Sequence, residues 1–476
     1  MFENVIQFHA RVHPDRPAMI MPHRQVSYRT LDQDIQKIAA RLREAIAPGA
    51  VVGVGLRGYY AHVLAGNAVV QLGGVTTSLA GRVGAETLKP DVVLRDSDDP
   101  RSSAPGAVSV DGAWLHDPAP AQRVRAGRPP SPDDPVQLLV TSGATGAPKR
   151  VLITRQMFDF RVMSFAMIRR MGPGARLLSL MGMDTSGGLV TPFQAWYAGG
   201  AVVTAKLALV DPEAPTRLMP NRLQASPAQL RAVLQQRPLG APPIPGLMVF
   251  TGGAVVPPAL VAELRGRLAA EVYILYGSTE AGALCCGRAE QLSGRRGAAG
   301  FLNPWTEARI VGPGGEDVSA AEVGEILVRT PYMPVGYVDD EARSARSFPG
   351  GWFRPGDLGS LSLDGVLTIA GRADDVVNLG GVKTNFEAIE KTAMDCPGVI
   401  DAGACALADA DGVQRAFVAV SSGPGFDAPT LRRRLSESAE GARIGVVVLD
   451  AIPRNGAGKI LRGELTDLVR GVQGAG

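Results

Sequence analysis

The chain has 476 residues, and its 49 basic and 46 acidic side chains leave a formal net charge of +3. This length predicts two or three domains, and a composition of 45% hydrophobic and 20% charged residues is typical of a folded protein rather than a disordered one. Because the charges nearly balance, the chain has no basic field of the kind that nucleic acid requires, and we expect no nucleic-acid partner.

Cysteine spacing and apolar runs indicate the cellular compartment. The four cysteines contain no Cys-x-x-Cys pair, which argues against a disulfide framework or a zinc site. The apolar runs are all shorter than the roughly 18 residues of a membrane helix, and Glu3 stands where a signal peptide would be apolar. We therefore expect reduced thiols, no membrane span and a cytoplasmic location.

Helical and strand patterns alternate through the first half of the chain. A strand at residues 26–28 is predicted to precede a helix at 31–46, which has apolar positions at helical spacing. Short apolar runs flanked by turn residues are typical of buried parallel strands. Residues 96–135 are rich in Ser, Pro, Asp and Arg, with a brief apolar island at 108–115, and we expect a surface loop there. The predicted strands are 51–55, 68–73, 92–94, 136–140 and 177–181.

The second half of the chain is richer in strand and turn patterns. A final unit that begins near Gly371 has about a hundred residues, enough for a small second domain. In the large part we expect strands at 308–311, 324–328 and 366–369. In the final unit we expect helices at 387–394 and 430–438 and strands at 403–407, 416–420 and 444–449.

Two common enzyme signatures can be set aside. Gly53-Val-Gly55-Leu-Arg-Gly58 matches the Gly-x-Gly-x-x-Gly pattern, but the acidic residue that binds ribose about 20 residues later in dinucleotide sites is missing. We interpret this segment as a strand and a turn. No histidine follows His116, and neither Gly-x-Ser-x-Gly nor His-Glu-x-x-His occurs, which removes the commonest hydrolase and metalloprotease signatures.

A predicted strand runs directly into a segment suited to phosphate binding, residues 138–149. Glycines allow backbone N–H groups to converge on anionic oxygens, hydroxyl side chains add donors, and a lysine adds positive charge. The segment is not a Walker loop, because Arg150 follows the lysine where Ser or Thr is required. A solvated turn rich in small residues is the alternative. The residues concerned are Thr141, Ser142, Gly143, Thr145, Gly146 and Lys149.

Four later segments carry complementary chemistry. Tyr276-Gly-Ser-Thr-Glu280 supplies a ring, two hydroxyls and a carboxylate, enough to hold a nucleobase and Mg²⁺. Asp357 follows a glycine turn, and its two oxygens can bind both hydroxyls of a ribose. The segments 371–375 and 455–459 place charged side chains on glycine-flanked loops, as a hinge or clamp does. Each segment alone is equally compatible with a polar turn.

In order and spacing, these segments resemble the motif series of the adenylate-forming enzymes, the superfamily of acyl- and aryl-CoA synthetases, luciferases and non-ribosomal peptide adenylation domains. The resemblance extends from Pro14-Asp-Arg-Pro-Ala18 to Pro453-Arg-Asn-Gly-Ala-Gly-Lys459 and beyond. It implies an α/β fold class: a large multi-layer N-terminal domain with mixed sheets, residues 1–370, and a small mobile C-terminal α+β domain, residues 371–476. It also implies two half-reactions. A carboxylate attacks the α-phosphate of Mg·ATP to give an acyl-adenylate and pyrophosphate, and the thiol of CoA or of a carrier-protein phosphopantetheine then displaces AMP.

The resemblance further implies a role for each motif residue. The loop that ends at Lys149 would hold the β- and γ-phosphates. Lys459 would bridge the carboxylate and the α-phosphate during adenylation. The remaining implied roles are α-phosphate contact for Thr279, Mg²⁺ binding for Glu280, adenine contact for Tyr276, nucleotide binding for Gly277, binding of the ribose hydroxyls for Asp357, ribose or phosphate contact for Arg372, the hinge for Asp374, and the thioester step for Gly381 and Lys383.

The acid substrate is implied to lie near residues that depart from the common pattern. Asp184 stands where many CoA ligases carry His or an aromatic ring, and in peptide-type adenylation domains an Asp here pairs with an amino group. Alternatively, Asp184 caps a helix that begins near Gly187. In the phosphate loop, Ala144 and Arg150 replace the usual hydroxyl residue and glycine. The implied acid-pocket residues are Asp184, Gly187, Ser226, Gly252, Gly253 and Ala254.

The sequence therefore predicts an AMP-forming ligase that joins a small carboxylic acid to a thiol, with CoA as the expected acceptor and ATP and Mg²⁺ as cofactors. A stand-alone adenylation enzyme that loads an amino acid onto a carrier protein is an alternative. A non-catalytic nucleotide-binding relative is a second alternative, against which Lys459, Glu280 and Asp357 together argue. Fatty, aryl and amino acids all remain open as substrates.

Overall fold

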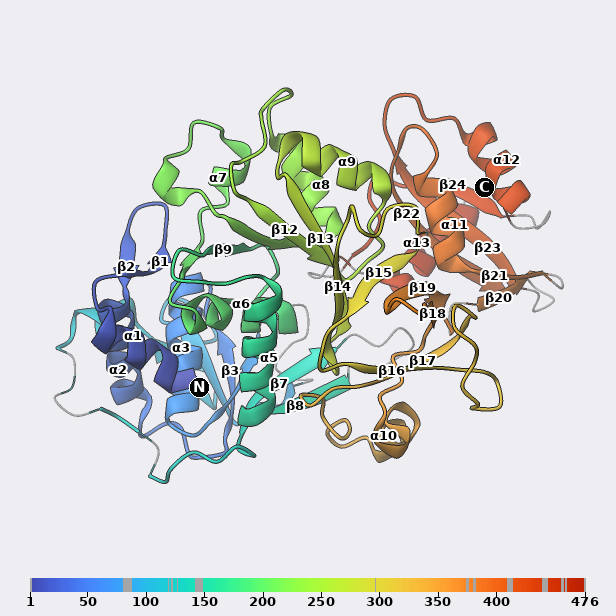
Figure 1. Ribbon diagram of the computed structural model, residues 1–476. Helices are drawn as coiled ribbons and strands as arrows, with labels where there is room; N and C mark the ends of the chain where they lie inside the picture. The colour runs from blue at the N-terminus through green and yellow to red at the C-terminus, as the bar shows by residue number, and fades with distance from the viewer. Residues whose placement is uncertain are drawn as a thin grey trace.

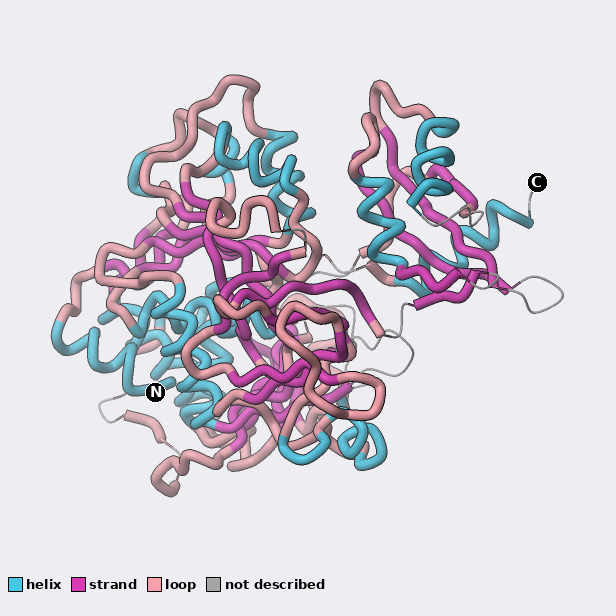
Figure 2. Tube along the Cα trace, turned by 45° about the vertical axis from the view of Figure 1, so that its right-hand side comes forward, coloured by secondary structure: helices cyan, strands magenta, loops and turns pink. Residues whose placement is uncertain are grey.

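The protein divides into a large N-terminal part and a small C-terminal part, which is orange to red in Figure 1 and stands beside the large part in the turned view of Figure 2. The structure is a computed structural model. It describes residues 2–79, 88–118, 120, 123–125, 127–141, 149–295, 297–373, 376–379, 382–408, 414–438, 444–454, 458 and 460–474.

The main sheet of the large part has 13 strands in the order β16-β17-β18-β19-β15-β14-β13-β12-β11-β9-β10-β1-β2. The neighbouring strands β13, β12, β11, β9, β10 and β1 run parallel to one another. On the other side of β13, each strand pairs antiparallel with the next, in the order β13, β14, β15, β19, β18, β17 and β16. The sheet is therefore mixed, as predicted. Its bounds are β1 (Pro17–Ile20), β2 (Gln25–Ser27), β9 (Arg176–Ser179), β10 (Ala201–Val203), β11 (Arg222–Ala225), β12 (Met248–Gly252), β13 (Glu271–Ser278), β14 (Gly282–Arg288), β15 (Ala298–Leu302), β16 (Glu307–Val311), β17 (Gly324–Arg329), β18 (Asp357–Leu361) and β19 (Val366–Arg372).

A second sheet of six strands, in the order β6-β5-β3-β4-β7-β8, lies in the same part. Only its last pair, β7 with β8, is antiparallel, and the segment between these two strands is the predicted phosphate loop. The bounds are β3 (Val51–Gly55), β4 (Val75–Ser78), β5 (Val92–Asp96), β6 (Ala107–Val110), β7 (Pro135–Thr141) and β8 (Lys149–Thr154).

Helices cover the two sheets, and apolar side chains fill the layers between them. Helices α5 and α6 pack against each other, α3 packs on β3 and β4, and α8 packs beside α9. Within the described ranges, no helix is both long and apolar enough to cross a membrane. The helices are α1 (Phe2–Val12), α2 (Tyr28–Leu42), α3 (Tyr59–Gln71), α5 (Arg155–Ile168), α6 (Ser186–Tyr197), α7 (Leu207–Val210), α8 (Pro227–Gln236), α9 (Pro258–Arg267) and α10 (Glu341–Ser347), with single 3-10 turns η1 (Gly112–His116), η2 (Thr216–Leu218) and η3 (Pro349–Gly351).

The small part is built on a three-stranded sheet, β22-β23-β24, that has helices on both faces. Side chains alternate along β23: Val418 and Val420 join the core with α11 and α12, whereas Ala419 joins the core with Leu465 and Val469 of α13. This alternation is the period of two expected of a strand that is buried on both faces. The elements are β20 (Val376–Leu379), β21 (Val382–Asn385), α11 (Phe386–Met394), β22 (Val399–Ala408), β23 (Gln414–Ser422), α12 (Ala428–Ser438), β24 (Gly445–Val448) and α13 (Arg462–Gly474).

Most predicted elements and the α/β fold class are confirmed, and two local predictions are wrong. Residues 68–73 do not form a strand, because they lie at the end of helix α3, whose residues are mostly buried. A helix buried on nearly all sides has a continuous apolar sequence, which hides its period. The region 96–135 is not all loop, since its apolar island forms β6 and the 3-10 turn η1. The four cysteines are free, as predicted.

The domain boundary at residues 370 and 371 stays a prediction. Strand β19 carries the main sheet through Arg372, and the Ala373 N–H donates to the Gly356 carbonyl at 2.9 Å. Residues 371–373, the first of the predicted small domain, are thus still bonded to the sheet of the large part.

Candidate active site

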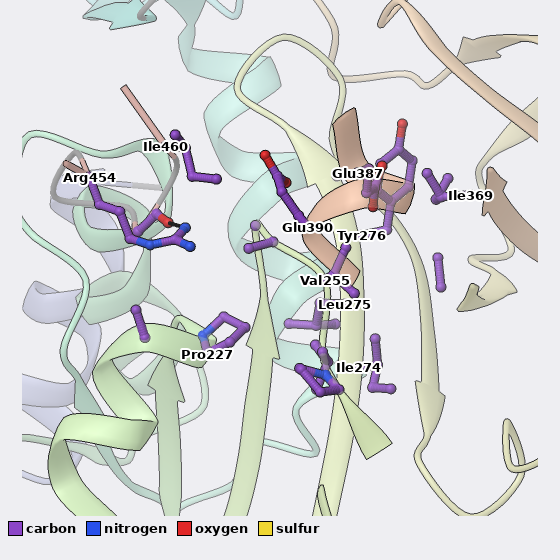
Figure 3. A pocket seen from close by; sticks show the side chains of 18 of the residues that line it. Pro227, Val255, Ile274, Leu275, Tyr276, Ile369, Glu387, Glu390, Arg454 and Ile460 are labelled. Atoms are coloured by element: carbon purple, nitrogen blue, oxygen red, sulfur yellow. Dashed lines mark hydrogen bonds between the residues drawn. The ribbon is translucent and has the colours of Figure 1, made fainter. Parts of the chain in front are cut away.

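One large cavity, with a volume of about 2140 Å³, lies between the two parts of the molecule. The large part contributes the end of β13 and the first residues of α6 and α8, and the small part contributes α11 and the segment around Ile460. Figure 3 shows Arg454 and Ile460 on the side of Pro227, and Glu390 on the side of Tyr276. Residues from both parts therefore face one space.

An aromatic ring, a carboxylate and a guanidinium meet at one wall of this cavity. Asp357 begins β18, Arg372 ends β19, and the antiparallel register pairs the two residues directly. One Asp357 oxygen accepts a hydrogen bond from the Arg372 guanidinium at 2.8 Å, and the other accepts one from the Tyr276 hydroxyl. Burial, together with the Asp357 charge, raises the pKa of Tyr276 well above its usual value, so the hydroxyl stays a donor. The structure thus brings together three residues predicted to bind nucleotide.

The turn between β13 and β14 carries Thr279 and Glu280 to the cavity. The Ser278 hydroxyl closes this turn by accepting a hydrogen bond from the Ala281 N–H at 2.9 Å. Glu280 is 7% exposed, and its carboxylate accepts a hydrogen bond from the Tyr337 hydroxyl at 2.9 Å. Burial and the charge of Glu280 raise the pKa of Tyr337, which keeps that hydroxyl protonated.

The donor set at Glu280 fits a magnesium ion that is shared with phosphate. In nucleotide sites, Mg²⁺ is usually bound by one or two carboxylates together with substrate phosphates and water. The Tyr337 hydrogen bond uses part of the acceptor capacity of the Glu280 carboxylate, which has about four lone-pair positions in all. Within the described part of the chain, no group of three or more His, Cys, Asp or Glu side chains could hold a metal alone. A protein-only metal cage therefore has no support there.

Lys149 and Arg150 begin β8 close to this carboxylate. The Lys149 Nζ is 3.5 Å from the Tyr337 hydroxyl and 5.2 Å from the centroid of its ring. Arg150 stands where the common pattern has glycine, and its guanidinium forms an ion pair with the Asp339 carboxylate. Ser142, Gly143, Ala144, Thr145 and Gly146 lie outside the described residues, as does the side chain of Thr141.

Asp184 lines the cavity just before helix α6, but it is not the helix cap. The helix begins at Ser186, and the Thr185 hydroxyl accepts a hydrogen bond from the Gly188 N–H at 2.9 Å. The capping interpretation of Asp184 is therefore wrong, because Thr185 has the extended backbone and the hydrogen bond of an N-cap. Gly187 lies in the first turn of the helix.

Two predicted site glycines, Gly252 of the acid pocket and Gly277 next to Tyr276, lie where backbones approach closely. A Cβ atom on Gly252 would lie 2.1 Å from the Leu275 carbonyl oxygen, and one on Gly277 would lie 2.1 Å from the Gly282 carbonyl oxygen. Both separations are far inside van der Waals contact, so a larger residue at either position must displace a strand. The close approach of strands at the cavity wall accounts for both glycines.

Three other predicted pocket residues differ in their surroundings. Gly253 and Ala254 line the cavity. Ser226 is fully buried as the N-cap of α8, and its hydroxyl accepts a hydrogen bond from the Gln229 N–H at 3.3 Å. The Gln229 side chain accepts a hydrogen bond from the Ser226 N–H at 2.9 Å, which completes a capping box, and it is Pro227 that lines the cavity.

The predicted residues of the small domain lie at or beside positions that the structure does not describe. Lys459, Asp374 and Gly381 lie outside the described residues, and Lys383 is described only as part of strand β21.

The two neighbours of Lys459 in the chain, Gly458 and Ile460, line the cavity. Arg454 donates to the Gly458 carbonyl at 2.6 Å and binds the Asp401 carboxylate at 2.8 and 2.9 Å, which anchors this segment to β22. The chain on both sides of the predicted lysine therefore faces the cavity.

The sequence profile of a family described as AMP-binding enzyme matches residues 6–338. This chain belongs to the AMP-binding enzyme family. The matched region includes the turn with Glu280 and its partner Tyr337. The predicted membership of the adenylate-forming superfamily is thereby confirmed.

Two relatives and one solved structure show how far the similarity of this AMP-binding enzyme extends. It is 28% identical over 356 residues to the 2-hydroxy-7-methoxy-5-methyl-1-naphthoate–CoA ligase of Streptomyces carzinostaticus, which covers 70% of this chain but only 62% of that relative, less than two thirds of its length. It is 28% identical over 517 residues to the fatty acid–[acyl-carrier-protein] ligase ScoC of Streptomyces coeruleorubidus, covering 97% and 95% of the two chains. The o-succinylbenzoate CoA synthetase MenE of Bacillus subtilis, in complex with ATP and a magnesium ion, superposes with a TM-score of 0.85 at 23% identity, over 98% of this chain and 99% of that one. That likeness supports the fold.

Sequence reasoning missed two residues of this AMP-binding enzyme that hold the motif residues in place. Tyr337 binds the Glu280 carboxylate, and Arg161 of α5 donates to the Thr279 and Glu280 carbonyls. Arg161 did leave a signal, because it falls at helical spacing between Phe158 and the apolar residues that follow, on the buried face of α5.

Proposed function

We propose that this protein is an AMP-forming acid–thiol ligase, most simply an acyl- or aryl-CoA ligase. The observation that carries the proposal is that two groups of side chains meet at one cavity lined by both parts of the molecule. The first group is Asp357 with its partners Tyr276 and Arg372, and the second is Glu280 with its partner Tyr337. The first chemical group suits a ribose, and the second suits Mg²⁺ with phosphate. The two relatives described above are named as a CoA ligase and an acyl-carrier-protein ligase, and both names denote enzymes that join an acid to a thiol.

In the proposed reaction, ATP lies along the wall from Asp357 to Glu280. The remaining acceptor positions of Asp357 bind the ribose hydroxyls, Thr279 contacts the α-phosphate, and Lys149 neutralises the outer phosphates. Bound Mg²⁺ supplies charge neutralisation for the phosphates, and Glu280 is the side chain that holds it. Bringing an acid carboxylate to the α-phosphate joins two anions, so the fixed positive charges offset their repulsion.

The small domain completes the site in this proposal. Lys459, flanked by the cavity residues Gly458 and Ile460, bridges the acid and the α-phosphate during adenylation. A carboxylate oxygen attacks the α-phosphorus and pyrophosphate leaves. For the second step the small domain turns about Asp374 and brings Gly381 and Lys383 to the site, where a thiolate attacks the acyl carbon and AMP leaves.

Asp184 favours a second candidate, an enzyme that activates an amino acid and loads it onto a carrier protein. Because Thr185 caps α6, the Asp184 carboxylate at the cavity is free of that structural duty. A carboxylate at this place would pair with the ammonium group of an amino acid. Asp184 therefore distinguishes the two candidates.

The deciding experiment is ATP–pyrophosphate exchange measured across a panel of fatty, aryl and amino acids. Exchange driven by one chemical class supports the first half-reaction and identifies the acid class. CoA and a phosphopantetheinylated carrier protein are then compared as acceptors by thioester formation. Binding of ATP without exchange for any acid would move the assignment to a non-catalytic nucleotide-binding relative.

A further inference from the structure

Arg161 is a buried cation bonded to the backbone of the turn with Thr279 and Glu280, and all five of its N–H donors have acceptors. Its side chain, on α5, is 1% exposed. Its Nη1 donates to the Thr279 carbonyl at 2.9 Å and, more weakly, to the Ser186 hydroxyl at 3.4 Å. Its Nη2 donates to the Glu280 carbonyl at 2.8 Å and to the Tyr332 carbonyl at 3.1 Å, and Nε donates to Tyr332 as well, at 3.3 Å.

Apart from the Ser186 hydroxyl of α6, these acceptors are carbonyl groups of the two chain segments that carry the Glu280–Tyr337 pair. Thr279 and Glu280 form the turn after β13, and Tyr332 begins the segment that leads, five residues later, to Tyr337. The two segments are far apart in sequence, yet one planar guanidinium binds carbonyl groups of both. The carboxylate of the first segment then meets the hydroxyl of the second at 2.9 Å.

Placing a cation here is costly, which argues for a purpose other than packing. The Arg161 side chain is 1% exposed, so its guanidinium is removed from water and depends on the carbonyl groups around it to replace that hydration. An apolar side chain on this face of α5 would avoid the cost, but it would leave three backbone carbonyls without a donor.

We propose that Arg161 is a positioning residue for the metal site: it fixes the Glu280 and Tyr337 segments so that the carboxylate is held ready for Mg²⁺. The proposal rests on the proposed function, because only there does Glu280 bind the metal. Arg161 does not touch the metal or the nucleotide in this arrangement. It acts through the geometry of Glu280 and its hydroxyl donor.

The shape of the guanidinium is essential to this role. Five donors in a rigid plane can bind carbonyls of two segments at once, whereas a lysine ammonium is a single point with three donors. Arg161→Lys therefore keeps the charge but loses the bridge between the segments. Side chains that orient metal ligands typically account for about 10- to 100-fold in metal affinity.

The test is the Mg²⁺ dependence of ATP binding, measured by calorimetry without any acid substrate, for the wild type and for Arg161→Lys. We expect the Mg²⁺ concentration at half-saturation to rise about tenfold or more, while ATP binding in EDTA changes less than about threefold. The matched control is Arg237→Lys. Arg237 is 4% exposed and donates to the Arg267, Leu209 and Pro242 carbonyls at 2.6–2.7 Å, so its loss perturbs folding without touching the cavity.

A double-mutant cycle with Tyr337→Phe separates positioning from general destabilisation. If Arg161 acts through the Glu280–Tyr337 pair, the two substitutions together raise the Mg²⁺ requirement by less than the product of their single effects. Equal Mg²⁺ dependence in the wild type and Arg161→Lys, with ATP binding intact, overturns the inference and leaves the proposed function standing. Absence of ATP binding in the wild type overturns both. If Arg161→Lys fails to fold, Tyr337→Phe alone decides, since an unchanged Mg²⁺ requirement in that variant also overturns the inference.

Discussion

Substitution of Asp357 gives the sharpest test of the nucleotide site. Its carboxylate already accepts hydrogen bonds from Arg372 and Tyr276, which use two of about four lone-pair positions. The other two positions are available for the ribose hydroxyls. A hydrogen bond to a charged group contributes about 1.5–3 kcal/mol.

The two variants Asp357→Asn and Asp357→Ala should therefore differ in a graded way. Asn keeps one carbonyl oxygen but loses the charge, so we expect a loss of about one such bond, or about 10- to 100-fold in kcat/KM for ATP. Ala removes both oxygens, and we expect a loss of about 10² to 10⁴-fold. The KM for the acid should change much less, because the carboxylate contacts only the nucleotide.

The assay is ATP–pyrophosphate exchange with ATP and acid varied separately, supported by calorimetric titration with AMP. Asp317→Asn is a matched control, because Asp317 forms an exposed ion pair with Arg309 at 2.8 Å on the same domain, and it should leave the KM for ATP within about twofold. A folded Asp357→Ala variant with unchanged affinity for ATP and AMP would refute the ribose assignment.

Three further predictions test other parts of the molecule. Lys459→Ala should abolish adenylate formation but still convert supplied acyl-adenylate and thiol to thioester; equal loss of both steps would contradict a role in the first step alone. Thr185→Ala should lower the free energy of unfolding by about 1 kcal/mol through loss of the α6 cap. Asp184→Ala should leave the free energy of unfolding nearly unchanged and should reduce ATP–pyrophosphate exchange only with amino acids. Equal destabilisation of the two variants in urea titrations would restore a structural role for Asp184. Burial lowers the pKa of His62 from 6.5 to about 4. The unfolded chain therefore binds a proton at this histidine more readily than the folded protein does, so the stability that neutral His62 contributes is present above pH 6.5 and is lost as the pH falls toward 4. At pH 5 the loss is about 2 kcal/mol. His62→Gln should flatten the pH dependence of urea unfolding between pH 8 and 5, whereas substitution of the exposed His23 should not.

Most strands were predictable because their apolar residues form short runs that end at turn residues, a pattern typical of buried strands. Strands such as β3 were bounded correctly by the turn residues around short apolar runs. The same rule failed at Ala68, Val69 and Val70, since α3 is enclosed by apolar neighbours and shows no polar face. An apolar run of six residues does not by itself distinguish a strand from the end of a buried helix.

The motif residues were predictable, whereas their supports were not, and the difference has a physical cause. Residues that bind anions, ribose or metal must be of a few chemical types, and several of them must come from one short segment, so the turn with Thr279 and Glu280 stands out in the sequence. A residue that holds a motif residue in place needs only to form a hydrogen bond to it, and it can come from any part of the chain. Tyr337 reaches Glu280 from 57 positions away, and Arg161 reaches Tyr332 from 171 positions away. Such separations leave no local pattern that identifies the contact, although the helical spacing of Arg161 does indicate its burial.

This contrast also bears on how the site tolerates change. A residue such as Arg161 is constrained by shape and reach, because it holds carbonyl groups of two segments, whereas Glu280 is constrained by the chemistry of metal binding. The position of the Arg161 side chain matters, because three backbone carbonyls buried in the interior lose their donor at once if it moves. Substitution of Glu280 should therefore remove the metal site outright, whereas substitution of Arg161 should leave the same ligand in a less favourable position, which raises the Mg²⁺ requirement and can be offset by more Mg²⁺.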